Sequence, residues 1–285
     1  MSDLQGKTVV VTGATSGIGR ATAIGLARLG PRLVLLGRNP ERCDETLAAI
    51  KTETGRSDVE LVRCDMSSLA GIRTAADEVN TLAPRIDVLV NNAGVTMTSR
   101  TVTDDGFETT FAVNHLAYFA LTRHLLPNII GAAPARIVNV ASDAHRFVRG
   151  IDLGDLQNER AFSGMRVYGQ SKSANIHFTR ELARRLEGTG VTVNALHPGG
   201  IRSNLGRGNG ALTDAVHRVV QLFLKSPEQG ASTSIYLASD PDVEGKTGGY
   251  YARSRPAKPA THCLDGETAE KLWEISEKLT GVAYP

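Results

Sequence analysis

Cysteine is scarce in this chain of 285 residues, where it occurs only three times, at Cys43, Cys64 and Cys263. The three residues are scattered and odd in number, so they lack the close pairs that zinc sites and small disulfide scaffolds show. The sequence therefore predicts neither a metal site nor a disulfide framework. A reducing compartment fits such a set best, and we expect the protein to be cytoplasmic.

The sequence also lacks an excess of either charge and long apolar runs. The 32 basic and 30 acidic residues leave a formal net charge of +2, without the concentrated basic tract that nucleic-acid binding uses. No segment approaches the ~20 apolar residues of a membrane-spanning helix. The first seven residues, Met1 to Lys7, do not resemble a secretory signal sequence. We therefore expect no nucleic-acid partner and no membrane partner.

Short β-branched runs recur along the chain, with longer amphipathic stretches of helical length between them. The runs cover residues 8–11, 33–36, 59–62, 86–90, 136–140 and 191–195, and the helical stretches cover residues 17–29, 40–53, 67–82, 107–130 and 267–279. Continuous apolar strands are expected where helices cover both faces of a parallel sheet. The alternation predicts an α/β fold, namely a Rossmann-type doubly wound parallel sheet. No repeat or linker divides the chain, so we expect one domain over residues 1–285.

Three stretches rich in Gly, Pro, Asn, Asp and Arg interrupt this alternation, at residues 143–164, 199–210 and 252–266. The first two follow strands directly, where an open α/β sheet places its ligand. We therefore interpret residues 143–164 and the segment from 199 to 226 as substrate loops. The third stretch opens a C-terminal extension, residues 252–285, in which Trp273 is expected to pack in the core. Tolerated surface insertions remain the alternative for each stretch taken alone.

A glycine-rich turn follows the first predicted strand and opens a helix. It reads Thr12-Gly13-Ala14-Thr15-Ser16-Gly17-Ile18-Gly19. Glycines let the backbone approach a pyrophosphate, whose charge is favoured by the N–H groups and the dipole of the helix start. Such a turn alone is a weak signal, but its place between a strand and a helix indicates a dinucleotide site. The candidate contacts are Gly13, Thr15, Ser16, Gly17, Ile18 and Gly19.

The second strand ends at Gly37-Arg38, where NAD-specific proteins of this architecture usually offer an acid to the ribose hydroxyls. Arg38 offers instead a planar cation that suits a 2'-phosphate, with Arg42 one helical turn further on. The pattern favours NADP(H) as the cofactor and leaves NAD(H) open. A solvated arginine at a helix start is the alternative interpretation, and Glu41 lies between the two arginines.

The third and fourth strands also end in polar or small residues. Asp65, followed by Met66, could accept a hydrogen bond from the adenine amino group and could also cap the next helix. After the fourth strand, Asn92, Ala93 and Gly94 could bring the backbone close to the cofactor ribose. We therefore add these residues to the candidate cofactor site.

Tyr168 and Lys172 are four residues apart in a predicted helix, so they share one of its faces. A phenol is a poor base at neutral pH, but an adjacent cation favours its phenolate, which makes a tunable acid/base. Ser142, just past the fifth strand, could bind a substrate oxygen, and Asn114 lies in the preceding helix. Taken alone, a Tyr and a Lys at this spacing are more often surface neighbours.

In its motifs and their order, the sequence resembles the classical short-chain dehydrogenase/reductase family from about residue 7 to about residue 251. The glycine turn, the Asn-Asn-Ala-Gly element at 91–94 and the catalytic tetrad all have counterparts, the tetrad being Asn114, Ser142, Tyr168 and Lys172. Pro198-Gly199 resembles the family's turn beside the nicotinamide. Ser203 stands where many members have a threonine that touches the cofactor.

Within the family, Ser173-Ala174-Asn175 and residues 178–186 and 193–199 resemble the branch of retinol dehydrogenases and WW-domain oxidoreductases. The resemblance implies NADP(H)-dependent interconversion of a lipophilic alcohol and its carbonyl compound. Tyr168 would then exchange a proton with the substrate oxygen, which Ser142 holds. Lys172 would lower the pKa of the tyrosine and bind the nicotinamide ribose, and Asn114 would position a water.

Other functions and roles remain open. A non-catalytic NADP(H)-binding regulator of the same fold is one alternative, and an epimerase or dehydratase of the extended type is another. The expected partner is a small-molecule substrate, either an alcohol or a carbonyl compound. A homo-oligomer is also compatible with the sequence. His145 could be a second acid, but packing or capping of its loop is the expected role, and a structural role is expected for His197.

Overall fold

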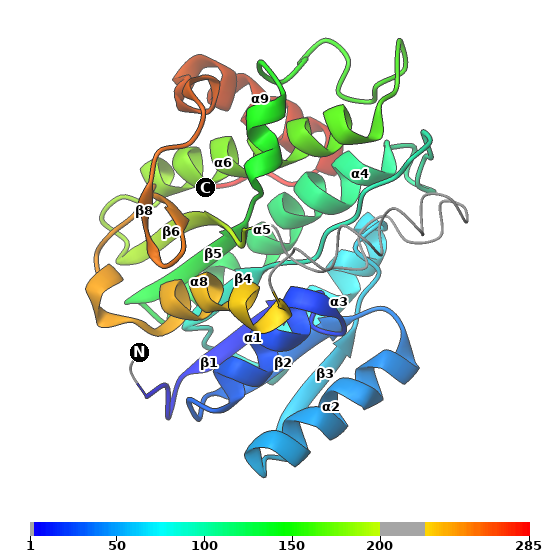
Figure 1. The fold of residues 1–285 in the computed structure, drawn as a ribbon. Helices are drawn as coiled ribbons and strands as arrows, with labels where there is room; N and C mark the ends of the chain where they lie inside the picture. The colour runs from blue at the N-terminus through cyan, green and yellow to red at the C-terminus, as the bar shows by residue number, and fades with distance from the viewer. Residues whose placement is uncertain (1–2, 200–225) are drawn as a thin grey trace.

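The computed structural model describes residues 3–199 and 226–285, which form an eight-stranded sheet with helices on both faces (Figure 1). In chain order the strands are β1 (Thr8–Thr12), β2 (Arg32–Gly37), β3 (Val59–Arg63), β4 (Val88–Asn91), β5 (Ala135–Val140), β6 (Val191–His197), β7 (Tyr250–Ala252) and β8 (Arg255–Ala257). Their order in the sheet is β3-β2-β1-β4-β5-β6-β7-β8. All neighbours are parallel except β7 and β8.

The helices divide between the two faces of the sheet. The principal ones are α1 (Gly17–Ala27), α2 (Pro40–Thr54), α3 (Leu69–Leu82), α5 (Ala117–Ile130), α6 (Gly164–Arg185), α8 (Pro227–Ser239) and α9 (Gly266–Thr280). α1 packs on α8 and α2, whereas α3 packs on α5, and α6 packs on α9 (Figure 1). The predicted doubly wound fold is confirmed. The direction of winding reverses between β1 and β4, which opens a ligand crevice there.

Alternating strand residues supply the two apolar layers, because successive side chains of a strand point to opposite faces. On β1, Val9 and Val11 pack with α1 and α8, whereas Val10 packs with α3 and α5. Trp273 of α9 is only 2% exposed and joins the second layer, in agreement with the packing role predicted for it. Strands buried on both faces therefore read as continuous apolar runs in the sequence.

The predicted helix over 107–130 is wrong in its N-terminal part, which is not a regular α-helix. A short helix α4 (Thr109–Phe111) begins after Glu108, whose carboxylate accepts hydrogen bonds from the N–H groups of Thr110 and Phe111. A π-helical turn η1 (Ala112–Leu116) then precedes α5. Such turns shift the phase of a helix and are frequent at functional sites, and this one carries Asn114.

Two of the three predicted loops contain regular structure. The stretch 143–164 opens with a 3-10 turn η2 (Asp143–Phe147), and the stretch 252–266 holds the edge strand β8 and a second 3-10 turn η4 (Thr261–Leu264). β8 was missed because it is three residues long, exposed and contains Pro256, which only an edge strand tolerates. The segment 200–225 lies outside the described residues. Among the helices that are described, none is long and apolar enough to cross a membrane.

Candidate active site

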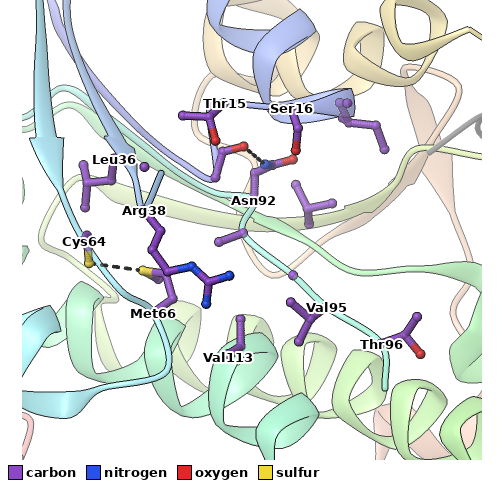
Figure 2. A pocket seen from close by; sticks show the side chains of 18 of the residues that line it. Thr15, Ser16, Leu36, Arg38, Cys64, Met66, Asn92, Val95, Thr96 and Val113 are labelled. Carbon is purple, nitrogen blue, oxygen red and sulfur yellow. Dashed lines mark hydrogen bonds between the residues drawn. The ribbon is translucent and has the colours of Figure 1, made fainter. Parts of the chain in front are cut away.

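A pocket of about 470 Å³ opens at the C-terminal ends of the central strands (Figure 2). Of the residues predicted for the site, it is lined by Gly13, Thr15, Ser16, Gly17, Ile18, Gly19, Arg38, Asp65, Met66, Asn92, Ala93, Gly94, Tyr168, Lys172 and Pro198. Asn114, Ser142 and Gly199 are not among the described residues that line the pocket. Each directly follows one that does, namely Val113, Ala141 or Pro198. Ser203 lies outside the described residues. The structure thus brings residues from five strand ends to one cavity.

The glycine turn packs against the end of β4 so closely that side chains are excluded. A Cβ on Gly13, which has φ +63°, would lie 2.7 Å from Ala93 Cα, and one on Gly19 would lie 2.1 Å from the Gly13 carbonyl oxygen. The Asn92 Nδ2 donates to the Thr12 carbonyl oxygen at 2.9 Å. It also donates to the Gly13 carbonyl oxygen at 3.3 Å (Figure 2). Asn92 therefore fixes the turn from the neighbouring strand.

The start of α1 fits the pyrophosphate of a dinucleotide. Within the described part of the chain, its N-cap Ser16 makes no side-chain hydrogen bond to the first turn, and that turn holds no acidic residue. The first N–H groups of α1 therefore keep their capacity to donate, and the helix dipole adds positive potential there. The residues present thus match the anionic group that the glycine turn predicts.

Arg38 extends from the end of β2 over the pocket toward Met66 (Figure 2). Its side chain is 73% exposed and lies 3.8 Å from the Asp65 Oδ2. An exposed pair of this kind stabilises the fold by only about 0–1 kcal/mol, so the guanidinium can turn to a stronger anion. Arg42 lines the same pocket, as does Asn39, whose Oδ1 accepts from the Arg42 N–H at 2.9 Å and caps α2. Two cations therefore border this end.

Asp65 does not cap α3, because Ser68 is the N-cap and accepts from the Gly71 N–H. The Asp65 Oδ1 instead accepts from the Ser67 N–H at 2.9 Å and the Ser67 Oγ at 2.7 Å, which closes the turn before the helix. Burial opposes the charged carboxylate, but these bonds and the Arg38 charge outweigh it and lower the pKa of Asp65. The carboxylate is therefore an anion at neutral pH that faces the pocket.

Both polar atoms of the Asn114 side chain make hydrogen bonds. Its Oδ1 accepts from the Val95 N–H at 2.8 Å, and its Nδ2 donates to the Val95 carbonyl at 3.0 Å and to the Ser171 Oγ at 2.9 Å. These bonds link the π-helical turn both to the segment after β4 and to α6. The sequence motif identified Asn114 but not Val95 or Ser171, because neither residue type carries a recognisable signal at its position.

Tyr168 and Lys172 lie one turn apart in α6 and face the pocket. The Lys172 Nζ is buried, donates to the Val140 carbonyl at 2.9 Å and lies 5.7 Å from the ring centres of both Tyr168 and Tyr118. Burial lowers the pKa of Lys172 to about 7. At neutral pH this amine is therefore close to its titration point.

The expected lowering of the Tyr168 pKa does not occur in this geometry. Burial raises the pKa of Tyr168, and the hydrogen bond with the Ser142 side chain offsets only part of that effect. The ammonium of Lys172 is held by the carbonyl of Val140 rather than by the phenol. Tyr168 therefore carries its proton at neutral pH, and its hydroxyl meets that of Ser142.

Pocket residues that the sequence did not single out are mostly apolar. They are Leu36, Gly37, Asn39, Cys64, Val95, Thr96, Met97, Val113, Val140 and Ala141. Apolar lining carries no spacing signal of its own, so only the fold could identify it. In residues 3–199 and 226–285 there is no group of three His, Cys, Asp or Glu side chains that could hold a metal ion.

Comparisons with known proteins agree with this geometry. The family model of short chain dehydrogenases matches residues 7–211. Retinol dehydrogenase 14 of Mus musculus is 44% identical over 98% of this chain and 87% of its own length. An uncharacterised protein from Mycobacterium paratuberculosis superposes with a TM-score of 0.81 at 32% identity, over 100% of this chain and 97% of its own. The RhlG/NADP active-site complex of Pseudomonas aeruginosa superposes with a TM-score of 0.70 at 27% identity, over 94% and 98%. This chain therefore belongs to the short-chain dehydrogenase family, as an oxidoreductase similar to the retinol dehydrogenases.

Proposed function

We propose that this oxidoreductase interconverts an alcohol and a carbonyl compound with NADP(H), and that its substrate is a lipophilic small molecule. The observation that carries the proposal is the meeting of Ser142 with the protonated Tyr168 beside Lys172, at one end of a pocket whose other end holds Arg38. Tyr168 and Lys172, proposed for acid/base chemistry, and Arg38, proposed for phosphate recognition, line the same pocket, which supports the proposal. All four tetrad residues are present, so a non-catalytic regulator is not favoured.

The tetrad residues move and hold a proton at the substrate oxygen. The cofactor, when bound, supplies the hydride that reduces the carbonyl carbon. Tyr168 donates its hydroxyl proton to the carbonyl oxygen, and Ser142 holds that oxygen with a hydrogen bond. The raised pKa of Tyr168 keeps this proton in place at neutral pH, which suits the direction of reduction. Lys172 lies one turn from Tyr168 in α6, and Asn114 bonds Ser171 of the same helix, where it would position a water for the return of the proton.

NADP(H) is the proposed cofactor, and NAD(H) stays the second possibility. Arg38 and Arg42 border the pocket end where a 2'-phosphate would lie, and the start of α1 suits the pyrophosphate. The NADP in the solved Pseudomonas relative supports this choice. The remaining predicted contacts, including Pro198, Gly199 and Ser203, belong to the same proposal.

A lipophilic substrate is favoured by the apolar lining next to Tyr168. Val95, Met97 and Ala141 line the same pocket as Tyr168. Phe147 and Met165, in η2 and at the start of α6, are large apolar side chains that remain 73% and 59% exposed close to the tetrad residues in the chain. The substrate named for the relative, retinol, is an apolar alcohol of this kind.

The location and assembly of the protein also remain proposals. We propose that one domain serves both ligands, with segments 143–164 and 199–226 as substrate loops and 252–285 as a C-terminal extension. A cytoplasmic location is supported by three free, buried cysteines, which suit a reducing compartment. Homo-oligomerisation is possible for this fold, and a measurement of the molecular mass in solution tests it.

The test is a spectrophotometric assay of NADPH oxidation with all-trans-retinal, nonanal, a steroid ketone and acetophenone. We expect turnover of retinal or nonanal, and faster turnover with NADPH than with NADH. Tyr168→Phe is the control, because it keeps the ring and deletes the acid. Tight NADPH binding without turnover of any carbonyl would overturn the proposal in favour of the regulator.

A further inference from the structure

The C-terminal extension reaches back to the neighbours of three tetrad residues. The contacts are Ala260 N–H to His145 Nε2 at 3.0 Å, His262 Nε2 to Ser173 Oγ at 3.2 Å, and His115 Nε2 to Ser276 Oγ at 2.8 Å. His145 follows Ser142 by three residues, Ser173 is next to Lys172, and His115 is next to Asn114. We call Ala260, His262 and Ser276 the C-terminal brace. Each of its members thus meets an element that carries a proposed catalytic side chain.

His145 makes the most direct of these connections. Its Nδ1 lies 2.7 Å from the Ser142 carbonyl oxygen, which also accepts from the His145 backbone N–H at 3.3 Å. A carbonyl can only accept, so Nδ1 carries a proton, and the Ala260 N–H can only donate, so Nε2 carries none. One neutral tautomer satisfies both contacts. Burial also lowers the pKa of His145, and the nearby Arg146 and His262 lower it as well. The Ser142 carbonyl and Asp143 act in the opposite direction but do not outweigh these effects, so the neutral form is favoured.

Neighbouring rings hold the His145 side chain in place. It is fully buried, and its ring meets Tyr250 of β7 edge-on at 5.3 Å between centres. Tyr250 in turn stacks on His197, at 6.0 Å between centres, where β6 runs into the Pro198-Gly199 turn. Arg146 makes a second connection between this turn and the C-terminal segment, because it pairs with Asp143 and donates to the Lys258 carbonyl. The 3-10 turn after Ser142 is therefore fastened to the sheet and to the C-terminal segment.

We propose that His145 is a positioning residue for Ser142: its Nδ1–H fixes the serine carbonyl, while the Ala260 N–H of the C-terminal brace fixes its Nε2. The inference rests on the proposed reductase function and goes beyond it, since it assigns a positioning role to a C-terminal segment that does not line the pocket. Catalysis needs the Ser142 hydroxyl at a defined place beside that of Tyr168, within hydrogen-bond reach of the substrate oxygen, and small displacements lower turnover strongly. Neither His145 nor Ala260 is among the described residues that line the pocket.

Three variants separate positioning from packing. In His145→Leu both hydrogen bonds are lost, and we expect kcat to fall about ten- to hundredfold with an unchanged KM for NADPH. In His145→Asn the amide nitrogen replaces Nδ1, and we expect kcat to recover to within about threefold of wild type. Ile50→Val is the matched control, because Ile50 of α2 is buried in the other apolar layer and belongs neither to the C-terminal brace nor to the residues described as lining the pocket. It should lower the melting temperature and leave kcat unchanged.

A double-mutant cycle with Ser142→Ala provides the decisive measurement, using whichever of retinal and nonanal the wild type reduces faster. If His145 acts through Ser142, adding His145→Leu to Ser142→Ala should change kcat by less than about twofold. Losses that multiply would overturn the inference, as would full kcat in His145→Leu. An active wild type with either of these results refutes the positioning role alone. A wild type that reduces no carbonyl refutes the proposed function and the inference together.

Discussion

Replacement of Arg38 by alanine should shift cofactor preference away from NADPH. A charge-assisted hydrogen bond contributes about 1.5–3 kcal/mol, and the 73% exposure of Arg38 places it in the lower part of that range. Its contact with Asp65 at 3.8 Å contributes only about 0–1 kcal/mol, so little is lost when the guanidinium turns to a phosphate. We therefore expect Arg38→Ala to raise the Kd of NADPH about tenfold and to leave that of NADH within about twofold.

Calorimetric titration of both cofactors into wild type and variant measures this difference directly. Arg28→Ala is the matched control, since Arg28 is also an exposed arginine paired with a carboxylate, that of Glu53, but does not line the pocket. It should change neither Kd. Lower salt should enlarge the effect at Arg38, because the contact is exposed and screened. Equal losses for NADPH and NADH in Arg38→Ala would remove this residue from the 2'-phosphate site.

Three further predictions concern the tetrad and the core. Tyr168→Phe should lower turnover about 100- to 10,000-fold with an unchanged Kd for NADPH, and near-normal turnover would exclude it as the acid. Lys172→Met should become less stable relative to wild type as pH rises above 7. The pKa of Lys172 is about 7 in the folded protein against the usual 10.5, so between these pH values the unfolded chain binds a proton that the folded protein has lost, and the stability of the wild type rises with pH. The Met variant lacks this gain, and urea unfolding of both proteins at several pH values measures the difference. Trp273→Ala should destabilise the fold by about 3–5 kcal/mol in urea, because the side chain is 2% exposed, and a loss below about 1 kcal/mol would contradict its packing role.

The central strands could be predicted from the sequence because their burial on both faces leaves a continuous signal. Residues 33–36 were expected as a strand and β2 covers Arg32–Gly37, a difference of one residue at each end. The glycine turn and the Tyr168–Lys172 pair were predictable for a related reason. Their chemistry depends on local spacing, a tight turn before a helix and one helical turn between two side chains.

Elements stabilised by contacts with distant parts of the chain could not be predicted. β8 exists only because β7 offers an antiparallel partner, and its own three residues have no strand pattern. The π-helical turn at Ala112–Leu116 carries Asn114, whose side chain bonds Val95 and Ser171, 19 and 57 residues away along the chain. The apolar spacing over residues 107–130 predicts only a helix, and it does not reveal that one of the turns is a wider π-helical turn.

The sequence by itself determined the doubly wound architecture, because each strand and helix is encoded in residues close together in the chain. The glycine turn and the Tyr168–Lys172 pair that we propose for the site could be recognised for the same reason. Tertiary structure alone decided the protonation of the site, since the raised pKa of Tyr168 and the lowered pKa of Lys172 follow from burial. It also decided the environment of His145. The Ala260 contact that holds this ring spans 115 residues, a distance at which sequence patterns carry no information on which side chains meet.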